Sequence, residues 1–218
     1  MTIAVPWDFR IAREIAKPLA GAGVHPNAVT TFGLAVGVAA GVLFALGGQA
    51  AANWAALLFI VAVLTDHVDG EVARLSGRTS VFGHYYDHIA AGLSYTAMFI
   101  GAGIGLGWVA GGGWAVAAGL AAGFSVIAIM FIRLKISVDE GAESIRQPVL
   151  LGFEPEDTLY AIGPITWLDG FTEFDGLLTF ILAAGIGAPV YLAQVVAQTR
   201  REMPEPRCAA FPQTKMGP

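Results

Sequence analysis

The sequence predicts an all-α polytopic membrane protein with six transmembrane helices, preceded by an N-terminal interfacial amphipathic helix. Of its 218 residues, 56% are hydrophobic and only 13% are charged. The mean hydropathy is +0.65, and a soluble domain of this length needs far more polar surface. Apolar runs long enough to cross a bilayer recur along the chain. Lys and Arg are confined to four segments, which alternate with loops that carry neither residue.

Residues 1–24 are expected to form the interfacial helix. Ile11, Ile15 and Leu19 recur at every fourth residue, and Trp7 and several charged residues flank them. This pattern is typical of a helix that lies on the membrane surface, with a disordered lead-in as the alternative. No clean apolar core precedes a cleavage site, so no cleavable signal peptide is predicted.

Residues 25–199 are expected to form the membrane domain, and residues 200–218, which contain four prolines, a disordered cytoplasmic tail. The fifth expected span is shorter than the others and is interrupted by a Gly-Pro pair. The expected spans are Val29–Leu46, a second one opening with Trp54–Leu64 and running into a charged stretch, Ile89–Val109, Gly113–Ile132, Thr158–Leu168 and Leu177–Val196.

The distribution of positive charge predicts the orientation. With six spans, all Lys and Arg fall on one side of the membrane, and the positive-inside rule makes that side cytoplasmic. Both termini and the site described next are therefore expected at the cytoplasmic face of a bacterial-type plasma membrane. The basic residues are Arg10, Arg13, Lys17, Arg74, Arg78, Arg133, Lys135, Arg146, Arg200, Arg201, Arg207 and Lys215.

Acidic residues gather where the second and third spans meet. Asp66 and Asp69 share one helix face, and Asp87 projects from the helix that follows the break at residues 76–78. Each carboxylate costs on the order of 2.5–3.5 kcal/mol at mid-depth in a bilayer. One or two divalent ions, Mg²⁺ or Mn²⁺, compensate this cost well, and Arg74 and Arg78 nearby complete a pyrophosphate pocket. The alternative is a set of solvated charges beside the membrane.

This segment resembles the signature of the CDP-alcohol phosphotransferase family, D-x2-D-G-x2-A-R-x8-G-x3-D-x3-D. The Pro26-Asn27 pair and the following Thr30 also resemble the start of the family's first span. Seven fixed signature positions match, namely Asp66, Asp69, Gly70, Ala73, Arg74, Gly83 and Asp87.

The resemblance implies a homodimer of six-span chains that binds a CDP-activated lipid or alcohol. It assigns metal ligation to Asp66, Asp69 and Asp87, and the cytidine pocket to Gly70 and Ala73. It places Arg74 on the nucleotide phosphate, and Arg78 and Gly83 join the expected substrate site. The implied reaction is attack by the hydroxyl of an acceptor alcohol on the CDP-alcohol, with release of CMP, as in phospholipid biosynthesis.

The last signature position departs from the pattern, because residue 91 is Ala rather than Asp. The usual candidate for the general base is thus absent. His88, Glu156 or Asp157 is the expected replacement, although the last two also suit a helix start after Pro155. Two other hypotheses are altered chemistry with one metal ion, and a pseudoenzyme that binds a CDP-lipid without turnover.

The remaining alternatives have less support. An intramembrane prenyltransferase generally carries two aspartate-rich motifs, and no second D-x2-D pair occurs here. A transporter is disfavoured because no inverted repeat is evident. Arg133, Lys135 and Arg146 are expected to bind an acceptor phosphate or lipid headgroups, or to set topology alone. No nucleic-acid partner is predicted, and the acceptor stays open.

Overall fold

The computed structural model describes residues 7–140, 155–171 and 175–202, and the described residues are helical with no β-strand. The α-helices are α1 (Trp7–Gly21), α2 (Pro26–Leu46), α3 (Gln49–Ser76), α4 (Val81–Leu106), α5 (Gly112–Glu140), α6 (Ile162–Asp169) and α7 (Gly176–Glu202). A π-helical turn, η1 (Gly107–Gly111), joins α4 to α5, and a 3-10 helix, η3 (Pro155–Ala161), leads into α6. The all-α prediction is confirmed for this part of the chain.

Five helices are long and apolar enough to cross a membrane: α2, α3, α4 with η1, α5 and α7. They correspond to five of the six expected spans, although α3 and α4 extend well beyond the apolar runs into the charged stretch. The fifth expected span, Thr158–Leu168, falls on η3 and the eight-residue α6. That helical segment is too short to qualify by itself.

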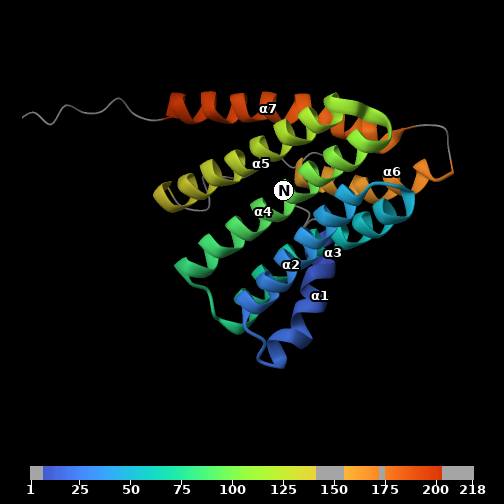
Figure 1. The fold of residues 1–218 in the computed structure, drawn as a ribbon. Coiled ribbons are helices and arrows are strands. Elements are labelled where there is room, and N and C mark those ends of the chain that lie inside the picture. Colours follow the sequence, from blue (N-terminus) through green and yellow to red (C-terminus); the bar gives the residue numbers. More distant parts are fainter. Residues whose placement is uncertain (1–6, 141–154, 172–174, 203–218) are drawn as a thin grey trace, which may run out of the picture.

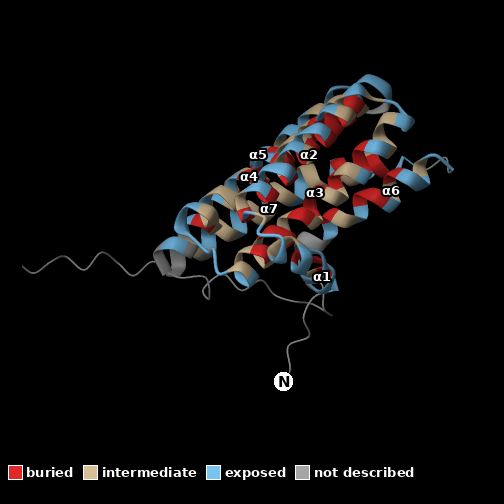
Figure 2. Ribbon diagram, turned by 90° about the horizontal axis from the view of Figure 1, so that it is seen from below, coloured by how far each residue is buried: buried red, intermediate tan, exposed pale blue. Residues whose placement is uncertain are grey.

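Figure 1 shows α4 in the middle of the bundle, with α2 and α3 on one side and α5 and α7 on the other. Buried residues lie along the inward faces of the helices, while the outer faces are exposed (Figure 2). The main core cluster joins α3, α4, α6 and α7 through Phe59, Met98, Ile162 and Ile181. The placement of α4 matters for function because it contacts both halves of the bundle.

Glycines allow α2 and α4 to approach until their backbones touch. A Cβ atom at Gly101 would overlap the carbonyl group of Gly41, and one at Gly105 would overlap that of Phe44. Membrane helices gain stability from such close packing, because lipid supplies no hydrophobic drive between them. These contacts hold the C-terminal halves of α2 and α4 together, so that the two helices run side by side.

Local signals end α3 and begin α4 where the sequence predicts a break. Gly77 terminates α3 in the left-handed conformation, with φ +66°. Ser80 caps α4, because its hydroxyl accepts a hydrogen bond from the Gly83 N–H at 2.9 Å. The tight turn therefore brings the acidic residues of α3 and α4 together.

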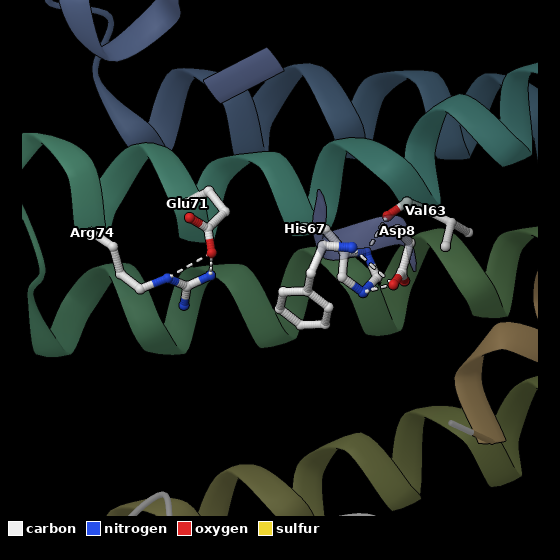
Figure 3. A network of polar contacts seen from close by, with 6 residues as sticks. Asp8, Val63, His67, Glu71 and Arg74 are labelled. Atoms are coloured by element: carbon white, nitrogen blue, oxygen red, sulfur yellow. Dashed lines mark hydrogen bonds and ion pairs between the residues drawn. The ribbon is translucent and has the colours of Figure 1, made fainter. Parts of the chain in front are cut away.

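Helix α1 docks on the motif half of α3 through a buried contact between Asp8 and His67 (Figure 3). Asp8 is 1% exposed, and its Oδ2 lies 3.2 Å from Nε2 of His67. The Nδ1 atom of His67 lies 3.0 Å from the Val63 carbonyl oxygen. Ala12 and Ala16 continue the buried face of α1, whereas its exposed face carries Trp7, Ile11 and Ile15. From the sequence, Asp8 was interpreted only as one of the charged residues that flank the apolar face of this helix. Its contact with His67 was not predicted.

Replacement of Asp8 by Ala is expected to destabilise the protein by about 1–3 kcal/mol, because it leaves the His67 ring nitrogen buried without its partner. Thermal unfolding of the purified protein in detergent measures the effect. Glu14→Ala is the matched control, since Glu14 pairs with Lys17 on the exposed surface and such pairs contribute less than about 1 kcal/mol. Equal unfolding temperatures for the two variants would contradict the role assigned to Asp8.

Candidate active site

Three acidic side chains meet at the interface of α3 and α4. Asp66 and Asp69 come from α3 and Asp87 from α4, and the carboxyl groups of Asp66 and Asp87 lie within hydrogen-bonding reach of each other. The Thr30 hydroxyl on α2 likewise lies within hydrogen-bonding reach of the Asp69 carboxyl group. Asp69 is 3% exposed. Oδ2 of Asp69 and Oδ1 of Asp87 are buried without a hydrogen-bond partner. Buried polar atoms almost always have partners, so these oxygens are suited to accept bonds from a ligand.

The donor set suits a hard divalent cation, because Mg²⁺ and Mn²⁺ prefer carboxylate oxygens. Among residues 7–140, 155–171 and 175–202, however, no three His, Cys, Asp or Glu side chains form a group that could hold a metal ion. The carboxyl groups adjoin one another without enclosing an ion. The residues thus fit a metal in chemistry and burial, and metal ligation remains a proposal.

A cavity of about 200 Å³ lies directly beside the carboxylates. It brings together the start of α2, the end of α3, the α3–α4 turn and the start of α4. All five residues predicted near the nucleotide line it with Asp69 and Asp87: Gly70, Ala73, Arg74, Arg78 and Gly83. The structure therefore brings these five residues together in one cavity.

Both arginines of this cavity are exposed and held by local contacts. Arg74 donates to Oε1 of Glu71 from Nε at 3.1 Å and from Nη2 at 2.7 Å (Figure 3). Arg78 donates from Nη1 to the Gly23 carbonyl oxygen at 3.1 Å. Guanidinium groups in such positions bind phosphate oxygens through paired hydrogen bonds.

Sequence reasoning missed several lining residues of the same cavity. Asn27 and Thr30 belong to the stretch that resembles the family's first span, and that resemblance was the available signal for them. The α3–α4 turn carried no signal beyond the helix break. The additional lining residues are Pro26, Asn27, Thr30, Thr79, Ser80 and His84.

Ala91 lies one turn beyond Asp87 on α4 and is 5% exposed. It lines a small cavity of about 10 Å³ together with Asp66, Asp69 and Tyr95. That volume is about the size of one water molecule. The position where the resemblance predicts a fourth carboxylate is therefore occupied by a methyl group beside the acidic cluster.

Of the three candidates for a replacement base, only His88 has a side chain within the described part of the chain. Nδ1 of His88 lies 3.1 Å from the His84 carbonyl oxygen and 3.8 Å from Oδ2 of Asp87. His88 is not among the residues that line the two cavities just described. Glu156 and Asp157 belong to η3, but their side chains lie outside the described part of the chain, as does Arg146.

Arg133 is placed away from the nucleotide cavity. Its Nη2 donates to the Tyr191 hydroxyl at 2.9 Å, and both residues line a different cavity, between α4, α5 and α7. The structure therefore does not bring Arg133 together with Arg74 and Arg78.

The sequence profile of the CDP-alcohol phosphatidyltransferase family matches residues 23–186, which include every residue that lines the two cavities at the acidic cluster. The chain belongs to this family. The match spans α2 to α6 and the first half of α7. Because its members act on membrane lipids and five helices qualify as spans, the chain is an integral membrane protein.

Individual relatives agree with this assignment. The chain is 34% identical over 104 residues to a phosphatidylinositol phosphate synthase of Streptomyces avermitilis, a match covering 48% of this chain and 41% of that one. It is 32% identical over 92 residues to an archaetidylinositol phosphate synthase of Pyrococcus horikoshii, covering 42% of this chain and 47% of that one. The chain thus spans somewhat less than half the length of each of these curated relatives.

A solved structure shares the fold. The crystal structure of Mycobacterium tuberculosis phosphatidylinositol phosphate synthase (PgsA1) with CDP-DAG bound superposes with a TM-score of 0.66. The match covers 86% of this chain and 92% of that one, at 23% identity. At this level of identity the likeness establishes the fold alone.

Proposed function

We propose that the chain is a metal-dependent membrane transferase. It moves a phosphatidyl or phospho-alcohol group from a CDP-activated lipid or alcohol to an acceptor hydroxyl and releases CMP. One observation carries the proposal: buried carboxyl oxygens without partners and two exposed arginines line the same cavity. That combination suits a pyrophosphate with its counter-ion. Family membership and the name of the CDP-DAG-bound relative support it.

Asp66, Asp69 and Asp87 are the residues that hold the metal in this proposal. One or two Mg²⁺ or Mn²⁺ ions, when bound, neutralise negative charge on the phosphates of the donor. Gly70, Ala73 and Gly83 leave room for the nucleotide, while Arg74 and Arg78 bind its phosphates. Phosphoryl transfer depends mainly on positioning and charge neutralisation. These side chains therefore supply most of the catalytic effect.

The proposal includes six transmembrane spans, of which η3 and α6 together form the fifth. Helix α1 lies at the interface between the membrane and the cytoplasm. The exposed Trp7, Ile11 and Ile15 of α1 support an interfacial position. All basic residues then face the cytoplasm, as do both termini. The domain limits stay as predicted from the sequence, and the family resemblance favours a homodimer.

His88 is retained as the proposed general base, because its Nδ1 lies 3.8 Å from Oδ2 of Asp87 and an imidazole titrates near neutral pH. His88→Ala is expected to lower the turnover number about 100-fold or more. Its dissociation constant for CDP should stay within about twofold, since the phosphate-binding arginines are unchanged. CMP-release kinetics and calorimetric titration with CDP provide the two measurements. Tyr85→Phe, at an exposed neighbouring position of α4, is the control, and unchanged turnover in His88→Ala would exclude this base.

The alternative function is a pseudoenzyme that binds a CDP-lipid without turnover. The methyl group of Ala91 beside Asp66 and Asp69 favours this alternative. Lipid profiling of a deletion strain separates the two: the transferase predicts the loss of a phospholipid class, whereas a binding protein predicts an unchanged set of classes.

A further inference from the structure

A second cavity, of about 320 Å³, lies between α4, α5, α7 and the start of η3. This volume is within the range of small-molecule sites. Its walls are almost entirely apolar, and small residues of α7, including Ala184 and Gly187, create the space.

The cavity is elongated along α7. Its lining residues on that helix run from Phe180 to Tyr191, a rise of about 16 Å at 1.5 Å per residue. At one end the rings of Phe99 and Phe180 stack with centroids 6.3 Å apart. The dimensions and the apolar walls suit a hydrocarbon chain.

The other end of the cavity is cationic. Arg133 donates to the Tyr191 hydroxyl at 2.9 Å, and its guanidinium carbon lies 6.0 Å from the centre of the Tyr191 ring. A guanidinium at one end of an otherwise apolar cavity complements an anionic headgroup with a hydrocarbon chain attached. A free soluble phosphate would leave the rest of the cavity unfilled.

The cavity and the nucleotide cavity lie on opposite sides of α4. The nucleotide cavity is built from α2, α3 and α4, whereas this one is built from α4, α5 and α7 (Figure 1). Tyr95 lines both the apolar cavity and the small cavity that contains Asp66, Asp69 and Ala91. Because attacking and leaving oxygens are roughly in line, the attacking alcohol enters from the side opposite CMP.

We infer that the acceptor is an anionic lipid that carries a free hydroxyl group, with one hydrocarbon chain in this cavity and its headgroup phosphate at Arg133. This inference rests on the proposed transferase function and names its acceptor class. The acceptor oxygen forms a bond to the phosphorus of the transferred group, and the bond from that phosphorus to the CMP oxygen breaks. CMP takes the electron pair, and the hydroxyl proton passes to the general base and then to water.

Gly187→Leu tests the inference, because no atom lies within 4 Å of a Cβ at Gly187 and the leucine side chain then fills the cavity without a backbone clash. Binding of radiolabelled phosphatidylglycerol to the purified protein in detergent is measured first. We expect at least tenfold weaker binding by Gly187→Leu and by Arg133→Gln, with unchanged CDP binding. Gly113→Leu is the matched control, since Gly113 also has open space around it but does not line the cavity.

CMP release from CDP-diacylglycerol is then compared with phosphatidylglycerol, glycerol 3-phosphate or inositol phosphate as acceptor. Faster release with the lipid, lost in Gly187→Leu, supports the inference. Faster release with a soluble phosphate, unaffected by Gly187→Leu, overturns it while leaving the transferase intact. If no acceptor supports release, the proposed transferase fails, and the binding measurement still decides whether an anionic lipid occupies the cavity.

Discussion

Replacing Asp69 by Asn is expected to lower metal-dependent CMP release by about 100- to 1,000-fold, the effect of losing one well-placed electrostatic group. The substitution keeps the shape of the side chain but removes the negative charge of a residue that is 3% exposed. It also replaces a carboxyl oxygen that has no hydrogen-bond partner. Initial rates of CMP release across a range of Mg²⁺ or Mn²⁺ concentrations measure the loss.

Asp175→Asn is the matched control for this substitution. Asp175 is an exposed aspartate that lines a separate cavity with Gly47, Gly48 and Asp169, so the account predicts an unchanged rate. Full activity of Asp69→Asn, at an unchanged metal requirement, would show that the carboxylate cluster is not the metal site.

Replacing Gly101 by Leu is expected to abolish the packing of α2 on α4 and to destabilise the protein by several kcal/mol, above the usual ~1–3 kcal/mol of overpacking. A side chain there meets the backbone of Gly41, which cannot move unless the helices separate. The yield of monodisperse protein after solubilisation and its thermal unfolding temperature report the loss.

Gly113→Leu serves as the control here too, because a side chain at that position enters open space. Separation of α2 from α4 would also displace Asn27 and Thr30 from the nucleotide cavity. Nucleotide binding is therefore expected to fall together with stability in Gly101→Leu. Normal stability of this variant would contradict the backbone contact as the basis of the α2–α4 packing.

The spans of the bundle were largely predictable, because apolar runs and glycine-rich helices are local signals that lipid imposes directly. The sequence also predicted that two helices carry the motif with a break at residues 76–78, and in the structure α3 ends at Ser76 and α4 begins at Val81. The fifth span was the weakest expectation, and it coincides with a 3-10 helix followed by the short α6. Its Gly-Pro interruption leaves no long apolar run to recognise.

The part of the cavity formed by residues 69–87 was predictable, since these residues are close in sequence on either side of the α3–α4 turn, whereas the lining residues Pro26, Asn27 and Thr30 of α2 were missed. The Asp8–His67 pair and the cavity at Arg133 were not predictable from spacing. Both depend on helices far apart in the chain meeting in a particular orientation. The Arg133–Tyr191 contact, for example, joins residues 58 positions apart.

Asp66, Asp69 and Asp87 are retained, whereas Ala91 stands where the resemblance predicts a fourth acid. This combination points to a transferase with an unusual site for the acceptor. The acceptor inference offers a physical reason for the change, because Ala91 and Tyr95 line the small cavity with Asp66 and Asp69, and Tyr95 also lines the apolar cavity. A methyl group at residue 91 adds no further charge beside Tyr95, which borders the apolar cavity.

CMP release by the purified wild-type protein tests the central claim most directly. The protein is reconstituted with CDP-diacylglycerol and phosphatidylglycerol, and release is followed with added Mg²⁺ or Mn²⁺ and again after chelation by EDTA. The account predicts release that requires the metal, stops on chelation and resumes when the ion is restored. Tight binding of CDP-diacylglycerol without CMP release, for lipid and soluble acceptors alike, would contradict it.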